Sequence, residues 1–201
     1  MTETRLDHWS QIYATPDHQG SWFRDSLDES VSALHKVAPH ETHTLIDVGA
    51  GRQHLSPSAF TPPLETIYLL DLSLPALGLE RPHGTDSRYQ VIIGDVTTAS
   101  LPTVDLWHDR AVLHFLTSDE ERAAYLNQAA RSIRSGGGIV ISGFAPEGPS
   151  ACSGLTVRQS SADELSREFG EYFETIETYE SPHRTPNGSE QLFSWFLGRR
   201  R

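Results

Sequence analysis

One short run of sequence, Leu45-Ile46-Asp47-Val48-Gly49-Ala50-Gly51, decides how the rest of the chain is interpreted. Its apolar residues predict a buried strand, and its two glycines predict a tight turn where the backbone comes close to a ligand. The next apolar run ends at Asp71, 22 positions after Gly49. An acidic side chain at the end of an adjacent parallel strand can accept hydrogen bonds from both hydroxyl groups of a ribose. The spacing therefore predicts a site for a cofactor that contains a nucleoside.

Short apolar runs alternate with polar segments along the chain, and this alternation predicts an α/β fold. Runs of strand length occupy residues 44–48, 67–70, 89–93, 104–107 and 139–141. Continuous apolar runs suit strands that are covered on both faces, as in a parallel sheet. Residues 172–179 and 191–197 have strand-like patterns on either side of a turn-rich segment. They predict a long hairpin that closes the sheet.

The N-terminal part of the chain has helical spacing on both sides of a break. Apolar residues recur every three or four positions over residues 6–13 and 27–34, which predicts two helices before the first strand. After the glycine turn, Pro57, Pro62 and Pro63 make a regular helix costly, at about 3 kcal/mol for a proline in a helix interior. We therefore expect a short, irregular connection between the first two strands.

Capping residues predict two further helices in the second half of the chain. Ser118 and Glu121 form a capping box that opens a helix, and the three glycines at 136–138 predict its end. A second capping box within residues 161–164 opens another helix, which is expected to end near Gly170.

The composition of the 201 residues limits the size of the fold and the possible partners. With 37% apolar residues the chain suits one domain over residues 1–201. Lys and Arg number 16 against 27 Asp and Glu, and the net charge of −11 disfavours binding to nucleic acid or an anionic membrane. The single cysteine, Cys152, is typical of a reducing compartment, and no run approaches the ~18 apolar residues of a membrane span. We expect a cytoplasmic protein.

The residues around the glycine turn distinguish between nucleoside cofactors. A dinucleotide site uses the pattern G-x-G-x-x-G, whereas here the third glycine is replaced by His54. With four further motifs the turn resembles the class I S-adenosylmethionine-dependent methyltransferases, in particular small bacterial proteins. The agreement in order and spacing covers about residues 43–145. The four motifs are Leu70-Asp71-Leu72-Ser73, Gly94-Asp95-Val96, residues 105–115 and residues 133–138.

The resemblance implies a fold, a cofactor and a division of the chain. The fold would be a three-layer Rossmann-like sandwich with a mostly parallel seven-stranded sheet and an antiparallel last strand. S-adenosyl-L-methionine would be the cofactor. Residues 1–40 would form a helical lid, residues 41–145 the cofactor-binding core, and residues 146–201 the substrate-side loops and the terminal hairpin. The family normally has a regular helix after the glycine turn, so the prolines there are a departure from its pattern.

Four positions would hold the nucleoside part of the cofactor if the resemblance is carried over residue by residue. Asp71 would hold the ribose hydroxyls, and Leu72 would lie beside it. Asp95 would accept a hydrogen bond from the adenine amino group, and Val96 would lie beside the ring.

Further positions would surround the methionine part of the cofactor. The turn Gly49-Ala50-Gly51 would pass beneath it, and Asp47 would shape the turn and orient the cofactor amine. At the end of the fourth strand, either Asp109 or Arg110 would face this part of the cofactor. The sequence leaves that choice open because the strand register is uncertain by one residue.

Aromatic residues near the N-terminus would cover the cofactor. Trp9, Tyr13, Trp22 and Phe23 would form this cover, and an aromatic face is a suitable neighbour for a sulfonium cation. Trp9 and Tyr13 could equally be plain packing residues. The same aromatic spacing is similar to that of a bacterial subgroup and of certain small lysine methyltransferases.

Catalysis of methyl transfer requires mainly alignment, with a base only where the acceptor must lose a proton. His114 is the first candidate for that base, with Asp109 beside it, although a histidine packed behind the fourth strand would explain His114 as well. Weaker candidates for the acceptor side are Arg110, Cys152, Arg158, His183, Arg184 and Gln191. No set of ligand spacings predicts a metal site.

Three functions remain open at this stage. The first is transfer of a methyl group from S-adenosylmethionine to a small molecule or to a protein side chain. The second is a nicotinamide-dependent oxidoreductase on the same architecture, against which the missing third glycine argues. The third is a non-catalytic protein that binds S-adenosylmethionine, since a fold by itself does not define an activity. The sequence does not determine the oligomeric state.

Overall fold

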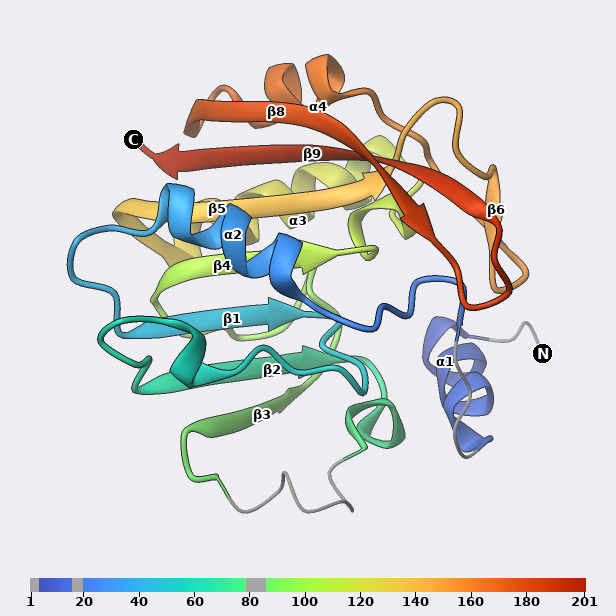
Figure 1. The fold of residues 1–201 in the computed structure, drawn as a ribbon, viewed down its shortest axis with the longest axis horizontal. Helices are drawn as coiled ribbons and strands as arrows, with labels where there is room; N and C mark the ends of the chain where they lie inside the picture. Colours follow the sequence, from blue (N-terminus) through green and yellow to red (C-terminus); the bar gives the residue numbers. More distant parts are fainter. Residues whose placement is uncertain (1–3, 16–19, 79–85) are drawn as a thin grey trace.

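The computed structural model describes residues 4–15, 20–78 and 86–201, and its centre is a seven-stranded sheet (Figure 1). The strand order is β3-β2-β1-β4-β5-β9-β8, and the first five of these strands are parallel neighbours. β9 runs antiparallel to both β5 and β8. The predicted α/β fold with an antiparallel last strand is therefore confirmed. The strands are β1 (Thr44–Val48), β2 (Thr66–Asp71), β3 (Tyr89–Ile93), β4 (Val104–Arg110), β5 (Ile133–Phe144), β8 (Phe173–Arg184) and β9 (Glu190–Arg200), with a separate small pair, β6 (Ala151–Cys152) and β7 (Leu155–Thr156).

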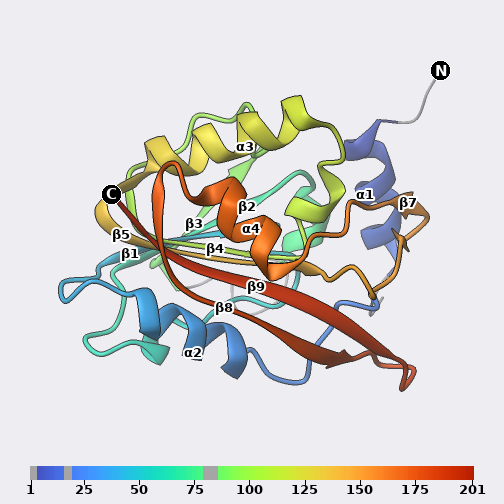
Figure 2. The same cartoon turned by 90° about the horizontal axis from the view of Figure 1, so that it is seen from above.

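Helices lie on both faces of the sheet and give the three expected layers (Figure 2). α3 (Asp119–Ser132) and α4 (Ala162–Phe169) cover one face, and α2 (Asp28–Val37) covers the other. α1 (Arg5–Ala14) lies beyond the carboxyl ends of the parallel strands. The capping boxes predicted for α3 and α4 are both formed. No helix in the described parts of the chain is long and apolar enough to cross a membrane.

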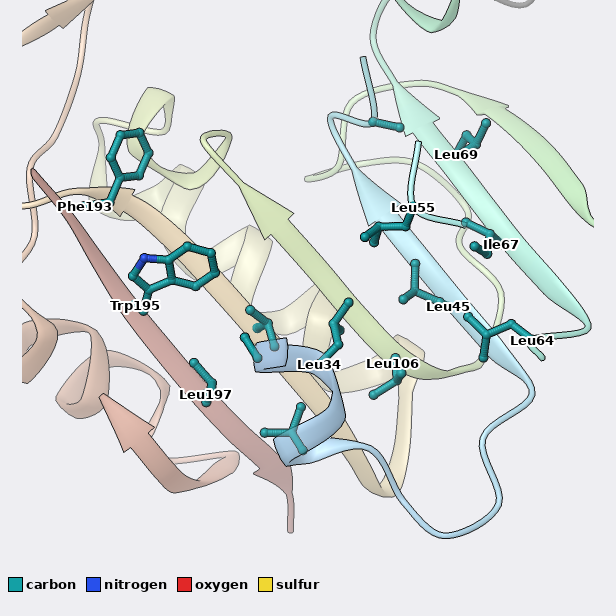
Figure 3. Close-up of a cluster of buried hydrophobic side chains, with 14 of the residues drawn as sticks. Leu34, Leu45, Leu55, Leu64, Ile67, Leu69, Leu106, Phe193, Trp195 and Leu197 are labelled. Carbon is teal, nitrogen blue, oxygen red and sulfur yellow. The ribbon is translucent and has the colours of Figure 1, made fainter. Parts of the chain in front are cut away.

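Apolar side chains pack against both faces of the sheet, so successive residues of a central strand enter different clusters. In β4, Leu106 packs in the cluster beneath α2, which Figure 3 shows, while Trp107 packs in the cluster beneath α3 and α4. Because side chains alternate along a strand, His108 and Arg110 share the face of Leu106, and Asp109 shares the face of Trp107. This alternation decides which charged residue reaches the carboxyl edge on each side.

The connection between β1 and β2 is irregular, as the prolines predict. Within residues 49–65, all of which are described, the structure has one short 3-10 turn, η1 (Pro57–Ala59), and no α-helix. Pro57 occupies the first turn of η1, a position that needs no backbone N–H donor. The missing helix leaves α2 as the main cover of this face.

The predicted end of α3 at the glycines 136–138 is wrong. The helix ends at Ser132, and the three glycines lie inside β5. A side chain at Gly138 would collide with Val37 of α2 and with Leu106 of β4, so glycine is needed there for close packing. Gly137 and Gly138 therefore allow close packing within a strand, although in sequence the three glycines have the same appearance as a helix stop.

Candidate active site

A cavity of about 730 Å³, which includes the open solvent at its mouth, lies at the carboxyl ends of β1, β2 and β4. We call it the main cavity. Carboxyl ends of parallel strands are where ligands bind in open α/β sheets. Eight residues expected at the cofactor line it, namely Tyr13, Trp22, Gly49, Asp71, Leu72, Asp95, Val96 and Arg110.

Asp71 fastens the glycine turn to the end of β2. Its Oδ2 accepts a hydrogen bond from Gly51 N at 3.1 Å, and its Oδ1 accepts one from Ser73 N at 3.0 Å. Burial raises the pKa of Asp71 to about 6, while these backbone donors act in the opposite direction. The carboxylate is thus partly buried, held by backbone groups and in contact with the main cavity.

Gly49 adopts a conformation that only glycine tolerates easily. Its φ is +63°, and a Cβ there would overlap Cγ2 of Val112. Gly136 has a similar φ of +77°, yet a Cβ there would meet nothing within 4 Å. An alanine would therefore strain the backbone at both positions, but only at position 49 would its Cβ also collide with a neighbouring side chain.

We expect Gly49→Ala to lower the free energy of unfolding by about 1–2 kcal/mol more than Gly136→Ala does, because overpacking adds to strain. Urea unfolding of both variants measures this difference. The Gly49 variant should also bind S-adenosylhomocysteine more weakly than the wild type, whereas Gly136→Ala should leave that affinity unchanged. Equal losses of stability in the two variants would contradict the tight fit of the turn against Val112.

Asp95 lies on the other side of the main cavity and is linked to α1. Its Oδ1 accepts hydrogen bonds from Thr97 N at 2.8 Å and from the Thr97 hydroxyl at 2.6 Å. Its Oδ2 lies 3.9 Å from Nη1 of Arg5, which also forms an ion pair with Glu121. α1 is therefore attached to the edge of the cavity by charge as well as by packing.

The end of β4 places Arg110, and not Asp109, in the lining of the main cavity. Arg110 lines the main cavity, and its Nη1 donates to the Trp22 carbonyl at 2.7 Å. Asp109 is fully buried on the opposite face, where it accepts hydrogen bonds from Val112 N at 2.9 Å and from Leu113 N at 3.1 Å. The position of Asp109 therefore does not support the prediction that it contacts the cofactor or acts in catalysis. Its side chain holds the turn that follows β4.

His114 also lies outside the main cavity. Its ring is stacked on Phe144 at 4.5 Å and meets the edge of Phe115 at 4.4 Å. Burial, with Arg122 nearby, lowers its pKa to about 3, and neither ring nitrogen has a hydrogen-bond partner among the described residues. The prediction of a base at this position is not supported, because a deeply buried ring cannot reach the cavity.

Other expected residues have structural partners near the cavity. Asp47 does not line the main cavity. Its Oδ1 lies 2.6 Å from Nδ1 of His108, and both side chains are buried. Ala50 and Gly51 line a neighbouring cavity of about 430 Å³, which we call the turn cavity. The two cavities have in common the residues Tyr13, Trp22, Gly49 and Arg110.

Aromatic rings from three segments lie together at the main cavity. The ring of Trp9 lies 5.7 Å from that of Trp22 and 5.1 Å from that of Phe115, and all three rings line the cavity. Tyr13 packs against Trp22 at 6.3 Å. Phe23 lines the turn cavity instead. Sequence patterns did not indicate Phe115, and its place is set by the turn that Asp109 holds.

Residues 20–24, which we call the strap, are held by side chains far away in sequence. His183 Nε2 lies 2.6 Å from the Ser21 carbonyl, and its Nδ1 accepts a hydrogen bond from Arg24 Nε at 3.2 Å. Cys152 Sγ lies 3.7 Å from the Ser21 hydroxyl. His183 and Cys152 thus hold the strap and do not line the main cavity.

The remaining acceptor-side candidates are distant from the main cavity. Arg158 pairs with Asp119 at 2.6 Å on the side of α3. In the β8–β9 hairpin, Arg184 lies opposite Glu190, and Gln191 lies opposite His183. Neither Arg184 nor Gln191 lines either cavity. In the described residues, no group of three or more His, Cys, Asp and Glu side chains is placed to hold a metal ion.

Sequence reasoning missed several residues that line the main cavity. Arg5 gave no signal, because its partners are about a hundred positions away. Ala111 and Val112 directly follow β4, so they are the next residues after Asp109 and Arg110, which were the predicted contacts at this strand end. The missed lining residues are Arg5, Val48, Leu70, Gly94, Ala111, Val112, Phe115 and Leu116.

A comparison with known families identifies this site. Residues 46–141, which contain the glycine turn, Asp71, Asp95 and Arg110, match the family model for a methyltransferase domain. Residues 46–141 therefore form a methyltransferase domain of the class I S-adenosylmethionine-dependent type. Its cofactor is S-adenosylmethionine, and the family decides against the nicotinamide-dependent alternative. No curated protein matches the chain in sequence.

Solved structures share the fold of this methyltransferase over nearly its whole length. An S-adenosylmethionine-dependent methyltransferase from Anabaena variabilis has a TM-score of 0.75 and 12% identity, covering 98% of this chain and 96% of that chain. The 1,6-didemethyltoxoflavin-N1-methyltransferase of Burkholderia thailandensis, solved with 1,6-didemethyltoxoflavin and S-adenosylhomocysteine, has a TM-score of 0.74 and 20% identity, covering 98% and 86%. A structure that concerns conversion of a disulfide bond into a thioacetal group during echinomycin biosynthesis has a TM-score of 0.73 and 18% identity, covering 98% and 92%. At these identities the likeness shows the fold.

Proposed function

We propose that this methyltransferase transfers the methyl group of S-adenosylmethionine to a small-molecule acceptor in the main cavity. The observation that carries the proposal is the roof formed by the rings of Trp9, Trp22 and Phe115 over the cavity that Asp71 and Asp95 line. A roof of large side chains favours an acceptor small enough to enter beneath it, over a side chain on a folded protein. The Burkholderia thailandensis structure, which has a small molecule bound, supports the same choice.

The lining residues fit the nucleoside part of the cofactor. Asp71 is a partly buried carboxylate at the edge of the main cavity, and a carboxylate can accept hydrogen bonds from ribose hydroxyls. Asp95 has one oxygen occupied by Thr97 and a second near Arg5, on the side where the adenine amino group would lie. Val96 is buried beside it and offers an apolar surface to a ring.

The methionine part would lie toward the turn cavity. Gly49 lines both cavities, and the absence of a side chain there lets the backbone come close to a ligand. When bound, the cofactor supplies a methyl group that its sulfonium already activates. The aromatic rings of Trp9 and Trp22 line the main cavity, and an aromatic ring is a suitable neighbour for the sulfonium cation. The contribution of the protein is then mainly to align the acceptor with that methyl group.

Isothermal titration calorimetry tests the proposal, with S-adenosylmethionine and S-adenosylhomocysteine as ligands and NADH as the control. We expect micromolar binding of the first two, about −8 kcal/mol, and none of NADH. Radiolabelled methyl transfer then follows, into separate small-molecule and protein fractions of a cell extract. Label should enter the small-molecule fraction. Label in the protein fraction alone would overturn the choice of acceptor, and failure of both cofactor forms to bind would overturn the site.

A further inference from the structure

We infer that the acceptor atom enters as an anion, pairs with the guanidinium of Arg110, and is methylated without a protein base. This inference rests on the proposed function, because it assumes methyl transfer in the main cavity. It names the substrate class: a small apolar or aromatic molecule with a carboxylate, phenolate or thiolate as its nucleophile.

The described residues that line the two cavities provide no obvious base. Asp71 accepts hydrogen bonds from backbone N–H groups on both oxygens, and Asp95 is occupied by Thr97 and Arg5. Burial and the nearby Asp71 raise the pKa of Tyr13, so its hydroxyl stays protonated. The other titratable groups there are the guanidinium groups of Arg5, Arg52 and Arg110.

No described histidine lines either cavity, including His54, whose Nε2 lies 2.9 Å from the Gly51 carbonyl, and His8, whose ring lies 5.4 Å from that of Trp9. His114 is buried behind the turn that follows β4 and does not line either cavity. His108 is buried against Asp47 and also lines neither. His183 has both ring nitrogens engaged, one by the Ser21 carbonyl and one by Arg24. An acceptor that must lose a proton would therefore find no histidine at hand among the described residues.

The guanidinium group of Arg110 brings a positive charge to both cavities. It lies where the two cavities adjoin, and its Nη1 donates to the Trp22 carbonyl. No described carboxylate forms an ion pair with it, although Arg5, Arg24 and Arg122 all have such partners. Burial and the neighbouring Arg24 lower the pKa of Arg110 to about 10, so it remains charged at neutral pH. The side chain of Arg110 is partly buried, and Asp47 and Glu29 lie near it without forming an ion pair. An anionic ligand in contact with the guanidinium would therefore lower the cost of burying this charge.

The chemistry of the transfer agrees with an anionic acceptor. The bond from the acceptor oxygen or sulfur to the methyl carbon forms, the bond from that carbon to the sulfonium sulfur breaks, and its electron pair stays on sulfur. No proton moves. The negative charge of the nucleophile and the positive charge of the sulfonium neutralise each other during the transfer. Their attraction is stronger in an apolar cavity, because charges are weakly screened there. A lysine ammonium would first have to lose a proton beside the positive Arg110.

Three probes with the same ring and different charges test the inference. Calorimetry at neutral pH measures benzoate, benzamide and benzylammonium binding to the complex with S-adenosylhomocysteine. We expect benzoate to bind at least about tenfold more tightly than the other two, as a charge-assisted pair allows. Arg110→Gln should remove this preference, Arg110→Lys should keep part of it, and Arg158→Gln, on the far side of α3, should keep all of it.

Several outcomes would overturn the inference. Equal binding of the three probes, tighter binding of benzylammonium, or no binding of benzoate at about 10 mM would each do so. A tenfold loss of affinity for S-adenosylhomocysteine in Arg110→Gln would assign the arginine to the cofactor instead. If the wild type fails to bind S-adenosylhomocysteine, the proposed function fails first, and the inference with it. If Arg110→Gln does not fold, the wild-type probe series and Arg110→Lys still decide.

Discussion

Asp109→Ala should lower the free energy of unfolding by about 3–5 kcal/mol, the cost of breaking a buried charge network. The carboxylate is fully buried and accepts hydrogen bonds from Val112 N, from Leu113 N and, at 2.6 Å, from the Tyr125 hydroxyl. Removing it leaves three buried donors without an acceptor. Urea unfolding, with circular dichroism as the readout, measures the loss.

Tyr125→Phe provides the matched comparison, because it removes a single partner of the same network. The Tyr125 hydroxyl accepts a hydrogen bond from Trp107 Nε1 at 2.9 Å and donates one to Asp109. We expect a smaller loss of about 1–3 kcal/mol. The double variant should lose less than the sum of the two single losses, since both remove the same bond. A stable Asp109→Ala protein that has lost only activity would restore Asp109 as a catalytic candidate.

The same network explains why an internal residue controls the cavity. Asp109 holds the backbone of the segment after β4, which contains Ala111 with φ +75° and the cavity-lining Val112 and Phe115. In Asp109→Ala, affinity for the cofactor should therefore fall together with stability. The side chain acts on the site through the shape of the turn.

Local signals in the sequence predicted much of the fold. The glycine turn, the capping boxes at Ser118 and Ser161 and the prolines after the turn are each set by a few neighbouring residues, and the structure has all of them. Such signals transfer directly because the backbone groups that they satisfy are close in sequence. The glycines 136–138 are the exception, since the role of Gly138 depends on Val37 of α2, which lies about a hundred positions earlier.

The candidate site was less accessible from sequence for two physical reasons. β4 is buried on both faces, so its residues do not alternate between apolar and polar, and the pattern cannot tell which face Asp109 or Arg110 takes. Contacts between distant segments gave no pattern either. The pairing of Arg5 with Glu121, and of Arg110 with a backbone carbonyl of the strap, depends on the folded arrangement alone.

Asp71→Ala should weaken binding of S-adenosylhomocysteine at least about tenfold, or 1.5–3 kcal/mol for lost charge-assisted hydrogen bonds. The change removes the proposed ribose acceptor and also the bonds that hold Gly51 N and Ser73 N. Calorimetry measures the affinity. Glu174→Ala, at an exposed position at the amino end of β8, is the control and should bind like the wild type.

The pH dependence of the same binding gives an independent check on Asp71. Because burial raises its pKa to about 6, the carboxylate is mostly ionised at pH 7 and becomes protonated as the pH falls through 6. A protonated carboxyl group has lost acceptor capacity, so affinity should decrease on the acid side and stay constant above pH 7. Burial also raises the pKa of Asp109 to about 6, so protonation of Asp109 can weaken binding in the same range through the turn after β4. Asp71→Ala should therefore show a smaller decrease than the wild type. An unchanged affinity in the variant at pH 7 would show that the ribose is held elsewhere.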